Sequence, residues 1–460
     1  MPLGSQGGLS TPNASEASQF VVKDFNFAVD KKTTANLSSQ DGITFTRSGA
    51  SYYVNQYSVL TSASTGEPVY GYDGSTSIGM RIEKATTNRV RGTALDNSSY
   101  WGTYGGYLQG TNSTGPDDVS ASGKRVEGED ANGLINYHAI WDAGSVTNGT
   151  STPHRNNWSG SVWARPGNAA YMGMFFSSGS KVGAAFHLNG DGSIVNSDNC
   201  TPSIERHGDW YLCKCENISN ISGSGVFGFT PSKTSALVWN DSGTGSWYQR
   251  TDFFDSETGG PPFFVTTYTP NYIYLYGPQF EDSTTCTSYM PNTSNATDGV
   301  TRNPDVVSIT EPNFSNFYNQ SQGTFLVEGR RSNAASASSS PTLLEVNNNS
   351  DTDTMAFNAS ATKEIFAITD AGGSANIEAG DDIAKNTAFK ISGGYKAGSY
   401  ATSLNGAAAV SNSFATVPTP DRMLIGNSTI ASGRELNGHI SRIRYWRRRT
   451  PDSYLKKIST

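Results

Sequence analysis

Alternating apolar and polar positions run through most of the chain. The clearest case is NYIYLYGPQFED, residues 271–282, where Tyr272, Tyr274 and Tyr276 occupy every second position with aliphatic residues between them. Side chains two residues apart share one face of a β-strand, so this spacing predicts a strand with a tyrosine face. Bulk on both faces indicates either an inner strand that is covered on both sides or a strand whose tyrosine face meets a ligand.

The pair Gly277-Pro278 follows these tyrosines directly. Proline has no N–H to donate to a strand ladder, so we expect the regular pairing to end there. Glu281 and Asp282 would then lie just past the strand. Two interpretations remain for this end: the wall of a binding site, or a structural strand end that carries acids.

Other short segments show the same period of two and are rich in β-branched and aromatic residues. The Asn-Gly pairs at 189–190 and 405–406 predict hairpin turns, because glycine accepts the positive φ of such turns. A calcium loop is the alternative at 189–192, but Asp191 is its only acid. The predicted strands lie within residues 20–27, 43–54, 187–195, 324–329, 342–346, 388–392, 398–406, 422–427 and 439–446.

The C-terminus predicts a short helix. Thr450 offers a hydroxyl N-cap, Pro451 suits the first helical position, and Asp452 places an acid in the first turn. Leu455 and Ile458 would give this helix an apolar side.

Composition supports an all-β fold. Of 460 residues only 16% are charged, helix formers are scarce, and the 11% aromatic content is too high for a disordered chain. The net charge of −7 argues against general binding of nucleic acid, and no apolar stretch of about 18 residues predicts membrane insertion. The N-terminus lacks the basic and apolar regions of a secretion signal.

The residues that carry chemistry give few signals. Cys213 and Cys215 share one strand face, and their spacing favours buried thiols over a zinc site. No strand carries the clustered carboxylates of a glycan-cleaving enzyme, and the acid clusters at 126–133 and 252–260 lie in turn-rich sequence. We therefore predict no catalytic residue, no metal and no cofactor, although a catalytic site assembled from distant loops stays open.

The strongest charge feature is RIRYWRRRTPDSYLKK, residues 442–457, which holds seven cations against Asp452 alone. One interpretation is an anion-binding surface for phosphate or acidic sugar. The others are a solvated strand face, or ion pairs with acids of the preceding region. The predicted surface places Arg442, Arg444 and Trp446 on one strand face and extends it through Arg447, Arg448 and Arg449.

Several segments together resemble bacteriophage virion proteins of the tail-fibre and head-spike-fibre type. Phe45–Ser48, Tyr72-Asp73 and Gly79–Asn88 are similar to the opening of that family, with Arg81 where the family usually has an aliphatic residue. Further similar stretches lie at 96–101, 115–128, 158–167, 208–219, 274–281, 287–291 and 298–310, in the family's order. The stretches 389–406 and 436–458 resemble laminin-G-like, concanavalin A-type sandwiches.

The resemblance implies tandem β-sandwich domains of jelly-roll and concanavalin A-like type behind a flexible N-terminal arm. The expected divisions are an attachment arm at 1–19, a first sandwich region at 20–310 and a laminin-G-like sandwich at 311–460.

It also implies a virion protein, a tail fibre or spike, which attaches to other virion proteins through its arm. Such a protein binds host-surface glycan and is commonly a homotrimer on the particle surface. The alternatives are a head fibre or capsid decoration protein, a glycan depolymerase, and a cellular surface lectin.

Overall fold

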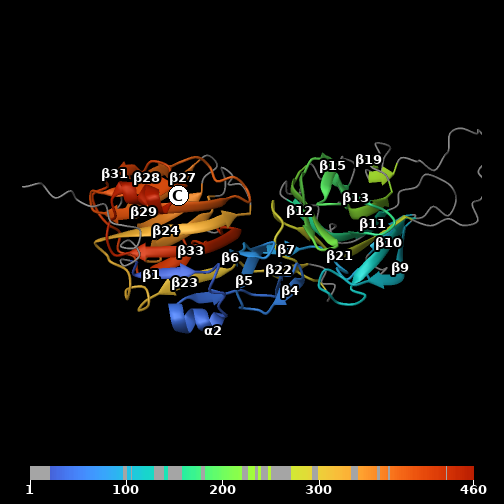
Figure 1. The fold of residues 1–460 in the computed structure, drawn as a ribbon, viewed down its shortest axis with the longest axis horizontal. Helices are drawn as coiled ribbons and strands as arrows, with labels where there is room; N and C mark the ends of the chain where they lie inside the picture. Colours follow the sequence, from blue (N-terminus) through green and yellow to red (C-terminus); the bar gives the residue numbers. More distant parts are fainter. Residues whose placement is uncertain are drawn as a thin grey trace, which may run out of the picture. The chain divides into compact units, whose positions relative to one another are not determined.

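The computed structural model consists mainly of short antiparallel strands (Figure 1). No helix among the described residues is long and apolar enough to cross a membrane. The expected arm at 1–19 lies outside the residues that the structure describes. These are residues 21–96, 101–104, 106–128, 139–142, 158–177, 182–219, 226–233, 237–239, 247–249, 271–292, 299–332, 340–359, 363–370, 373–430 and 433–460.

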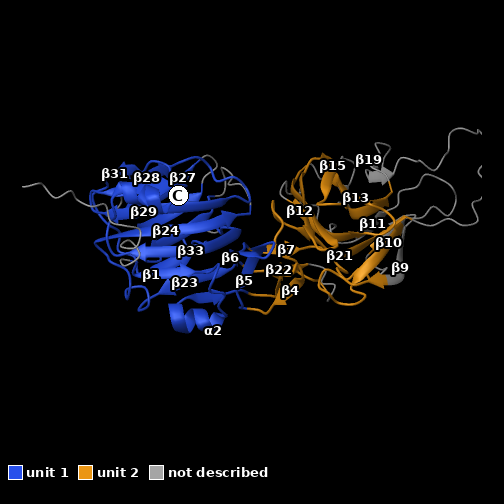
Figure 2. Cartoon of the chain, viewed as in Figure 1, with its two compact units in different colours: residues 1–47, 66–84, 304–460 blue, residues 48–65, 85–303 orange. Residues whose placement is uncertain are grey.

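The chain forms two compact units, and neither is a continuous stretch of sequence (Figure 2). Unit 1 comprises residues 1–47, 66–84 and 304–460, and unit 2 comprises 48–65 and 85–303. The all-β class and the sandwich architecture are confirmed. The units are not in tandem, however: unit 2 is inserted into unit 1, so the expected first region at 20–310 contains segments of both.

Unit 1 is a sandwich of two antiparallel sheets. Its core takes alternate residues from both sheets, for example Phe325 and Val327 from one and Val346 and Phe357 from the other. The first sheet has the order β31 (Val410–Asn412), β30 (Tyr400–Leu404), β29 (Ala388–Lys396), β24 (Gln322–Arg331), β33 (Gly438–Trp446), β6 (Thr76–Ile82) and β5 (Val69–Asp73). The second has the order β2 (Thr44–Thr46), β23 (Val306–Thr310), β32 (Arg422–Ile425), β25 (Thr342–Asn347), β26 (Asp353–Ala359), β27 (Glu364–Asp370) and β28 (Gly373–Ala379).

Strand β33 explains why the two ends of the sequence belong to one unit. Its residues 442–445 pair with β1 (Lys23–Asn26), and its residues 438–440 pair with β6. Strand alternation is local and was predictable from sequence, but the choice of a partner some 400 residues away leaves no local signal. The linear division at 310 differs from the structure for this reason.

Short helices complete unit 1. The predicted C-terminal helix is present as α3 (Asp452–Ile458), and its Leu455 side chain is buried. Its N-cap is Pro451 rather than the expected Thr450, whose hydroxyl lies 3.2 Å from that of Thr324 instead. The short helical turns α2 (Thr34–Asn36) and η1 (Leu37–Asp41) were not predicted.

A buried ion pair joins the places where the chain leaves and re-enters unit 1. Arg47 donates from Nε to Asp305 Oδ1 at 2.7 Å and from a second nitrogen to Oδ2 at 2.9 Å, and both side chains are fully buried. Arg47 also donates to the carbonyl of Glu67, and Asp305 accepts from the backbone N–H of Glu83. All three segments of unit 1 therefore meet at this pair.

Unit 2 is a second antiparallel sandwich, with a separate core in which Val162, Ile273 and Phe280 face Phe176 and Phe227. One sheet has the order β16 (Thr201–His207), β17 (Trp210–Ile218), β12 (Trp158–Pro166), β21 (Asn271–Glu281), β10 (Gly123–Gly128) and β9 (Gly106–Ser113), with β7 (Thr86–Asn88) beside β21 and β22 (Val300–Arg302) beside β7. The other has the order β15 (Ser193–Asp198), β14 (Gly183–His187), β13 (Tyr171–Ser177), β18 (Val226–Ser232), β11 (Ala139–Asp142) and β8 (Trp101–Tyr104). Two hairpins stand apart: β3 (Ser51–Val54) with β4 (Leu60–Ala63), and β19 (Leu237–Trp239) with β20 (Trp247–Gln249).

The predicted turn at 189–192 links β14 to β15. The backbone N–H of Gly192 donates to the carbonyl of Asn189 at 2.9 Å, and both glycines have positive φ. This geometry confirms the hairpin.

The predicted end of the tyrosine strand at Gly277 is wrong, because β21 continues to Glu281 through a β-bulge. Trp163 of β12 pairs with Tyr276 and Ser161 pairs with Gln279, so β21 carries one extra residue. Gly277 accommodates it with φ +57. The extra residue reverses the alternation beyond the bulge, which returns Phe280 to the core face.

Removing the carboxylate of the buried pair should destabilise unit 1 strongly. We expect Asp305→Ala to lower the free energy of unfolding of unit 1 by about 3–5 kcal/mol, because Arg47 would remain buried without its partner. Asp24→Ala is the control, since it breaks the exposed pair with Arg442 and should lose about 0–1 kcal/mol. Urea denaturation measures the free energy of unfolding of both variants. Equal losses would contradict the role of the Arg47–Asp305 pair in joining the three segments of unit 1.

Gly277→Ala should destabilise unit 2 through the bulge. An alanine there pays about 1–2 kcal/mol for positive φ, and its Cβ would lie 3.0 Å from the ring of Tyr289. Gly190→Ala is a matched control, because Gly190 has the same φ of +57 but nothing within 4 Å of the added Cβ. Thermal unfolding should show the larger loss for Gly277→Ala, and identical losses would show that the packing at Tyr289 contributes nothing.

Candidate functional site

The tyrosine face of β21 is part of a wider aromatic and basic surface on the outer side of its sheet. Tyr274 pairs across the sheet with Arg165 of β12 on one side and with Arg125 of β10 on the other. Trp163 lies opposite Tyr276. Because alternate residues share a face, these side chains project from the sheet on the side away from the core. We call Arg125, Trp163, Arg165, Trp210, Tyr272, Tyr274 and Tyr276 the aromatic–arginine face.

One part of this face is covered. Leu60 of the β3–β4 hairpin packs with the buried Trp163 and Trp210, and Tyr276 and Tyr289 border that cluster. The rings of Tyr276 and Tyr289 lie 5.6 Å apart, and burial raises the pKa of Tyr276 well above its usual value. This end is a small second core, as one of the two interpretations of the tyrosine strand expected.

The face curves inward. Trp210 on β17 and Gly123 on β10 are separated in the sheet by β12 and β21. Even so, a Cβ on Gly123 would lie 2.7 Å from the Trp210 ring. A side chain reaches across two intervening strands only if the sheet bends toward it. Glycine at position 123 leaves the space that the Trp210 ring occupies.

The other part of the face is only half-buried and pairs each tyrosine with an arginine. The guanidinium carbon of Arg125 lies 3.8 Å from the centroid of the Tyr272 ring, and that of Arg165 lies 5.8 Å from the centroid of Tyr274. The two tyrosine rings meet edge to face at 5.7 Å. Tyr272, Tyr274 and Tyr276 are therefore neither fully buried nor fully exposed. One end of the strand is covered, and the other end presents its tyrosines on a half-buried surface, so each of the two interpretations applies to part of it.

Two acids near this face pair with basic side chains. Glu127 pairs with Arg125, and the ammonium of Lys214 lies 2.7 Å from Glu205 Oε1 and lowers the pKa of that carboxyl. A carboxyl held ionised by a cation cannot donate a proton to a leaving group. This pairing makes Glu205 unsuited to act as a general acid.

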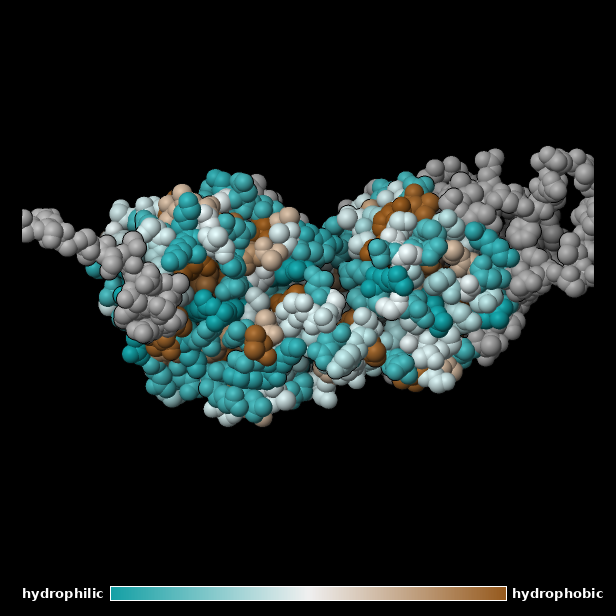
Figure 3. Space-filling model, viewed as in Figure 1, coloured by the Kyte–Doolittle hydropathy of each residue, from teal (hydrophilic) through white to brown (hydrophobic). Residues whose placement is uncertain are grey.

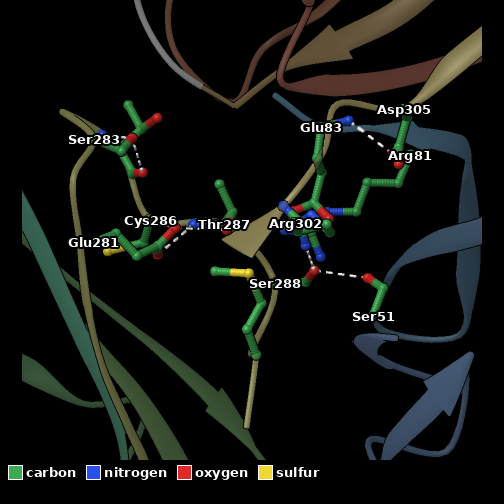
Figure 4. Close-up of polar contacts among 12 residues, drawn as sticks. Ser51, Arg81, Glu83, Glu281, Ser283, Cys286, Thr287, Ser288, Arg302 and Asp305 are labelled. Carbon is green, nitrogen blue, oxygen red and sulfur yellow. Dashed lines mark hydrogen bonds and ion pairs between the residues drawn. The ribbon is translucent and has the colours of Figure 1, made fainter. Parts of the chain in front are cut away.

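Gln279 and Glu281, beyond the bulge, are structural (Figure 4). Glu281 is fully buried and accepts from the backbone N–H and the hydroxyl of Thr287 at 2.8 and 2.6 Å. Gln279 donates to Glu281 at 2.7 Å and accepts from the backbone N–H of Met290. Burial raises the pKa of Glu281, and these donors oppose that rise. The acid of the opening motif holds the loop after β21.

A second polar cluster fixes the same loop from the other side. Arg302 of β22 donates to the hydroxyl of Ser288 at 2.5 Å, and Ser288 also lies 2.7 Å from Ser51 of β3 (Figure 4). The covering hairpin is thereby attached to the loop that follows the tyrosine strand. Its position over Trp163 depends on buried hydrogen bonds as well as on apolar contacts.

The basic C-terminal stretch is largely occupied by intramolecular contacts. Arg442 and Arg444 project from β33 on the side away from Ile443 and Tyr445, as predicted. Both reach Asp24 of β1: Arg442 at 2.8 Å and 2.5 Å, and Arg444 at 3.5 Å. This corresponds to the alternative of ion pairs with acids of the preceding region.

The remaining arginines of this stretch also bind protein atoms. Arg447 donates to the carbonyls of Phe317 and Asn316, and Arg449 donates to the carbonyl of Ser399 and pairs with Asp452. The side chain of Arg448 is exposed. Binding of an anion to these residues stays a prediction.

The prediction that Trp446 lies on an exposed face beside Arg442 and Arg444 is wrong. Trp446 is 1% exposed, and its ring meets that of Tyr454 in α3 edge to face at 6.2 Å. The strand alternation was read correctly, but the helix that follows folds back over this end of the sheet and covers the indole.

Cys213 and Cys215 are both buried free thiols on the core side of β17, as expected. The described residues contain no group of three or more His, Cys, Asp or Glu arranged to hold a metal ion.

Sequence reasoning missed Arg125, Trp163, Arg165 and Trp210 as parts of a site. The alternation in WSGSVWARPG shows that Trp163 and Arg165 share a strand face, which was the one available signal. Their position beside Tyr274 and Tyr276 depends on the pairing of β12 with β21, more than 100 residues apart.

Comparison with known proteins gives limited information. No family model matches the chain, and no curated protein matches it. Among solved structures, the CBM40 of the Ruminococcus gnavus IT-sialidase bound to alpha2,3 sialyllactose is 15% identical and covers 32% of this chain and 88% of its own, with a TM-score of 0.27.

A leech intramolecular trans-sialidase and the binding domain of botulinum neurotoxin DC are both 13% identical. They cover 32% and 34% of this chain and 25% and 39% of their own lengths, with TM-scores of 0.28 and 0.26. At these values the similarities carry no argument about function.

Proposed function

We propose that this chain is a glycan-binding protein whose binding surface is the aromatic–arginine face of unit 2. The observation that carries the proposal is the row in which Tyr272 and Tyr274 are half-buried beside Arg125 and Arg165. Aromatic rings stack on the apolar faces of sugars, and guanidinium groups donate to sugar oxygens. The row supplies both kinds of contact within one strand width of each other.

The surface of the protein is polar over most of the side seen in Figure 3. Figure 3 shows hydrophilic residues over most of the coloured surface in view, with apolar residues in small separate areas. Large apolar patches typically indicate docking of protein or membrane. A half-buried row of aromatic and basic side chains fits a sugar better.

The same face supports binding without cleavage. Glycoside hydrolysis uses a raised-pKa acid and a second carboxylate at a defined separation. Here Glu127 and Glu205 are each paired with a cation. We therefore propose that the protein binds glycan and is not an enzyme.

We further propose that the protein serves on a bacteriophage particle, as a tail fibre or spike that recognises host-surface glycan. The support is the resemblance of its ordered sequence segments to virion fibre proteins. A head fibre or capsid decoration protein remains the alternative. The virion partners and the homotrimer stay predictions, and light scattering checks the trimer: a stable monomer at micromolar concentration would contradict it.

Substitution in the half-buried tyrosine pair should weaken glycan binding without unfolding the protein. We expect Tyr274→Ala to weaken binding to host-surface polysaccharide about tenfold or more, by analogy with the ~1–3 kcal/mol of a stacking contact. Tyr57→Ala is the control, because that tyrosine is 76% exposed at the tip of the β3–β4 hairpin. Binding is measured on immobilised host polysaccharide, with circular dichroism to verify folding. Equal binding by both variants and the wild type would exclude this face.

The attachment arm is tested by truncation. A chain that begins at Phe20 keeps β1 and the hydrogen bond from Val22 to Tyr445. We expect it to fold with an unchanged melting temperature but to be absent from assembled particles, because the proposed attachment segment would be missing. Incorporation is measured by immunoblotting of purified particles. Wild-type levels of truncated protein would place the attachment elsewhere.

A further inference from the structure

The two arginines of the face differ in how completely they are satisfied. Arg125 stacks closely on Tyr272 and pairs with Glu127. Arg165 lies farther from its tyrosine, and its one ion-pair partner among the described residues is Asp209, at 3.6 Å. Its side chain is 33% exposed and that of Asp209 is 75% exposed. Arg165 is therefore the guanidinium that a ligand can reach.

The position of Asp209 is fixed by the backbone of its turn rather than by contacts of its carboxylate. It lies in the two-residue turn between β16 and β17, which His207 and Trp210 close by pairing across it. The turn also contains Gly208 at φ +63. No hydrogen bond fixes the Asp209 carboxylate to Arg165, since the 3.6 Å separation is longer than a hydrogen bond. An arriving carboxylate can replace it while the turn stays in place.

We propose that Arg165 binds the carboxylate of an acidic sugar in exchange for Asp209, so that the face selects carboxylated over neutral glycans. This rests on the proposed function. The planar guanidinium matches a carboxylate with two parallel N–H donors, which gives a stronger contact than the present 3.6 Å pair. The 5.8 Å between the guanidinium carbon and the Tyr274 centroid allows one sugar, with its carboxylate on the ring, to contact both.

General attraction between opposite charges does not account for such selectivity. The whole chain carries a net charge of −7, which repels acidic polymers at long range. Preference for an acid must then come from a local contact, and Arg165 offers one with a tyrosine beside it. The register fixes that neighbour, because Arg165 pairs directly with Tyr274.

The test compares sugars that differ only in the acidic group. Full-length protein is titrated with polyacrylamide conjugates of glucuronic acid, its methyl ester, glucose and 6-sulfated glucose, and of N-acetylneuraminic acid and its methyl ester. We expect at least one free acid to bind about tenfold more tightly than its ester, which charge-assisted hydrogen bonds typically supply. Arg165→Lys keeps the charge but loses the fork, and should abolish that preference.

Two further variants separate local exchange from net charge. Asp209→Asn and Asp198→Asn raise the charge of the chain equally, but Asp198 lies on β15 of the other sheet. We expect Asp209→Asn alone to tighten binding of the free acid, by about twofold to fivefold. Equal effects of the two variants would overturn the exchange.

The remaining outcomes distinguish this inference from the proposed function. If esters and acids bind equally and Tyr274→Ala still weakens binding, the proposed function stands and the carboxylate assignment is wrong. If the sulfated conjugate binds more tightly than every carboxylate, the anion is misassigned. If no conjugate binds and host polysaccharide does not bind either, the proposed function fails and this inference fails with it.

Discussion

The buried ion pair between Arg47 and Asp305 is the interaction on which the two-unit architecture depends. Unit 1 consists of three separate stretches of chain, and the pair, with Glu67 and Glu83 hydrogen-bonded to it, joins all three where they end. Both excursions of the chain into unit 2 begin and end at this buried cluster. A charge left there without its partner is strongly destabilising, so the pair commits three distant segments to one arrangement.

The same pair shows how far the sequence could predict the fold. Period-two alternation located most strands, and the Asn-Gly pairs located hairpins, because both signals are local. Arg47 and Asp305 are 258 residues apart, and no local pattern couples them. The family resemblance included both residues, Arg47 in the opening segment and Asp305 in the exit segment, without indicating that they touch. Similarly, Gln279, Glu281 and Thr287 belong to two neighbouring stretches of that resemblance, and in the structure hydrogen bonds join them into one loop.

The bulge at Gly277 explains why the tyrosine strand was only partly understood from sequence. A glycine followed by proline normally interrupts pairing, and here it inserts one residue without ending the strand. The reversal of alternation puts Phe280 in the core and turns Gln279 and Glu281 toward the tyrosine side, where Thr287 covers them. The three tyrosines therefore remain on one face, while Glu281 beyond them is buried and hydrogen-bonded. The acids expected beside a possible ligand surface are consequently part of its support.

The positions of the arginines show why cation density in a sequence is a poor guide to a binding site. The stretch 442–457 concentrates positive charge, yet Arg442 makes two close contacts with Asp24, and Arg447 and Arg449 bind backbone carbonyls. Arg165 is isolated in the sequence but faces Tyr274, and its ion-pair partner among the described residues is the exposed Asp209 at 3.6 Å. Charge that is already matched by close donors and acceptors gains little from a ligand, because binding exchanges one good contact for another. A loosely paired guanidinium next to an aromatic ring gains more from a ligand, because it gives up only a weak contact. The way each arginine is already paired, rather than the number of arginines, therefore favours unit 2 as the binding unit.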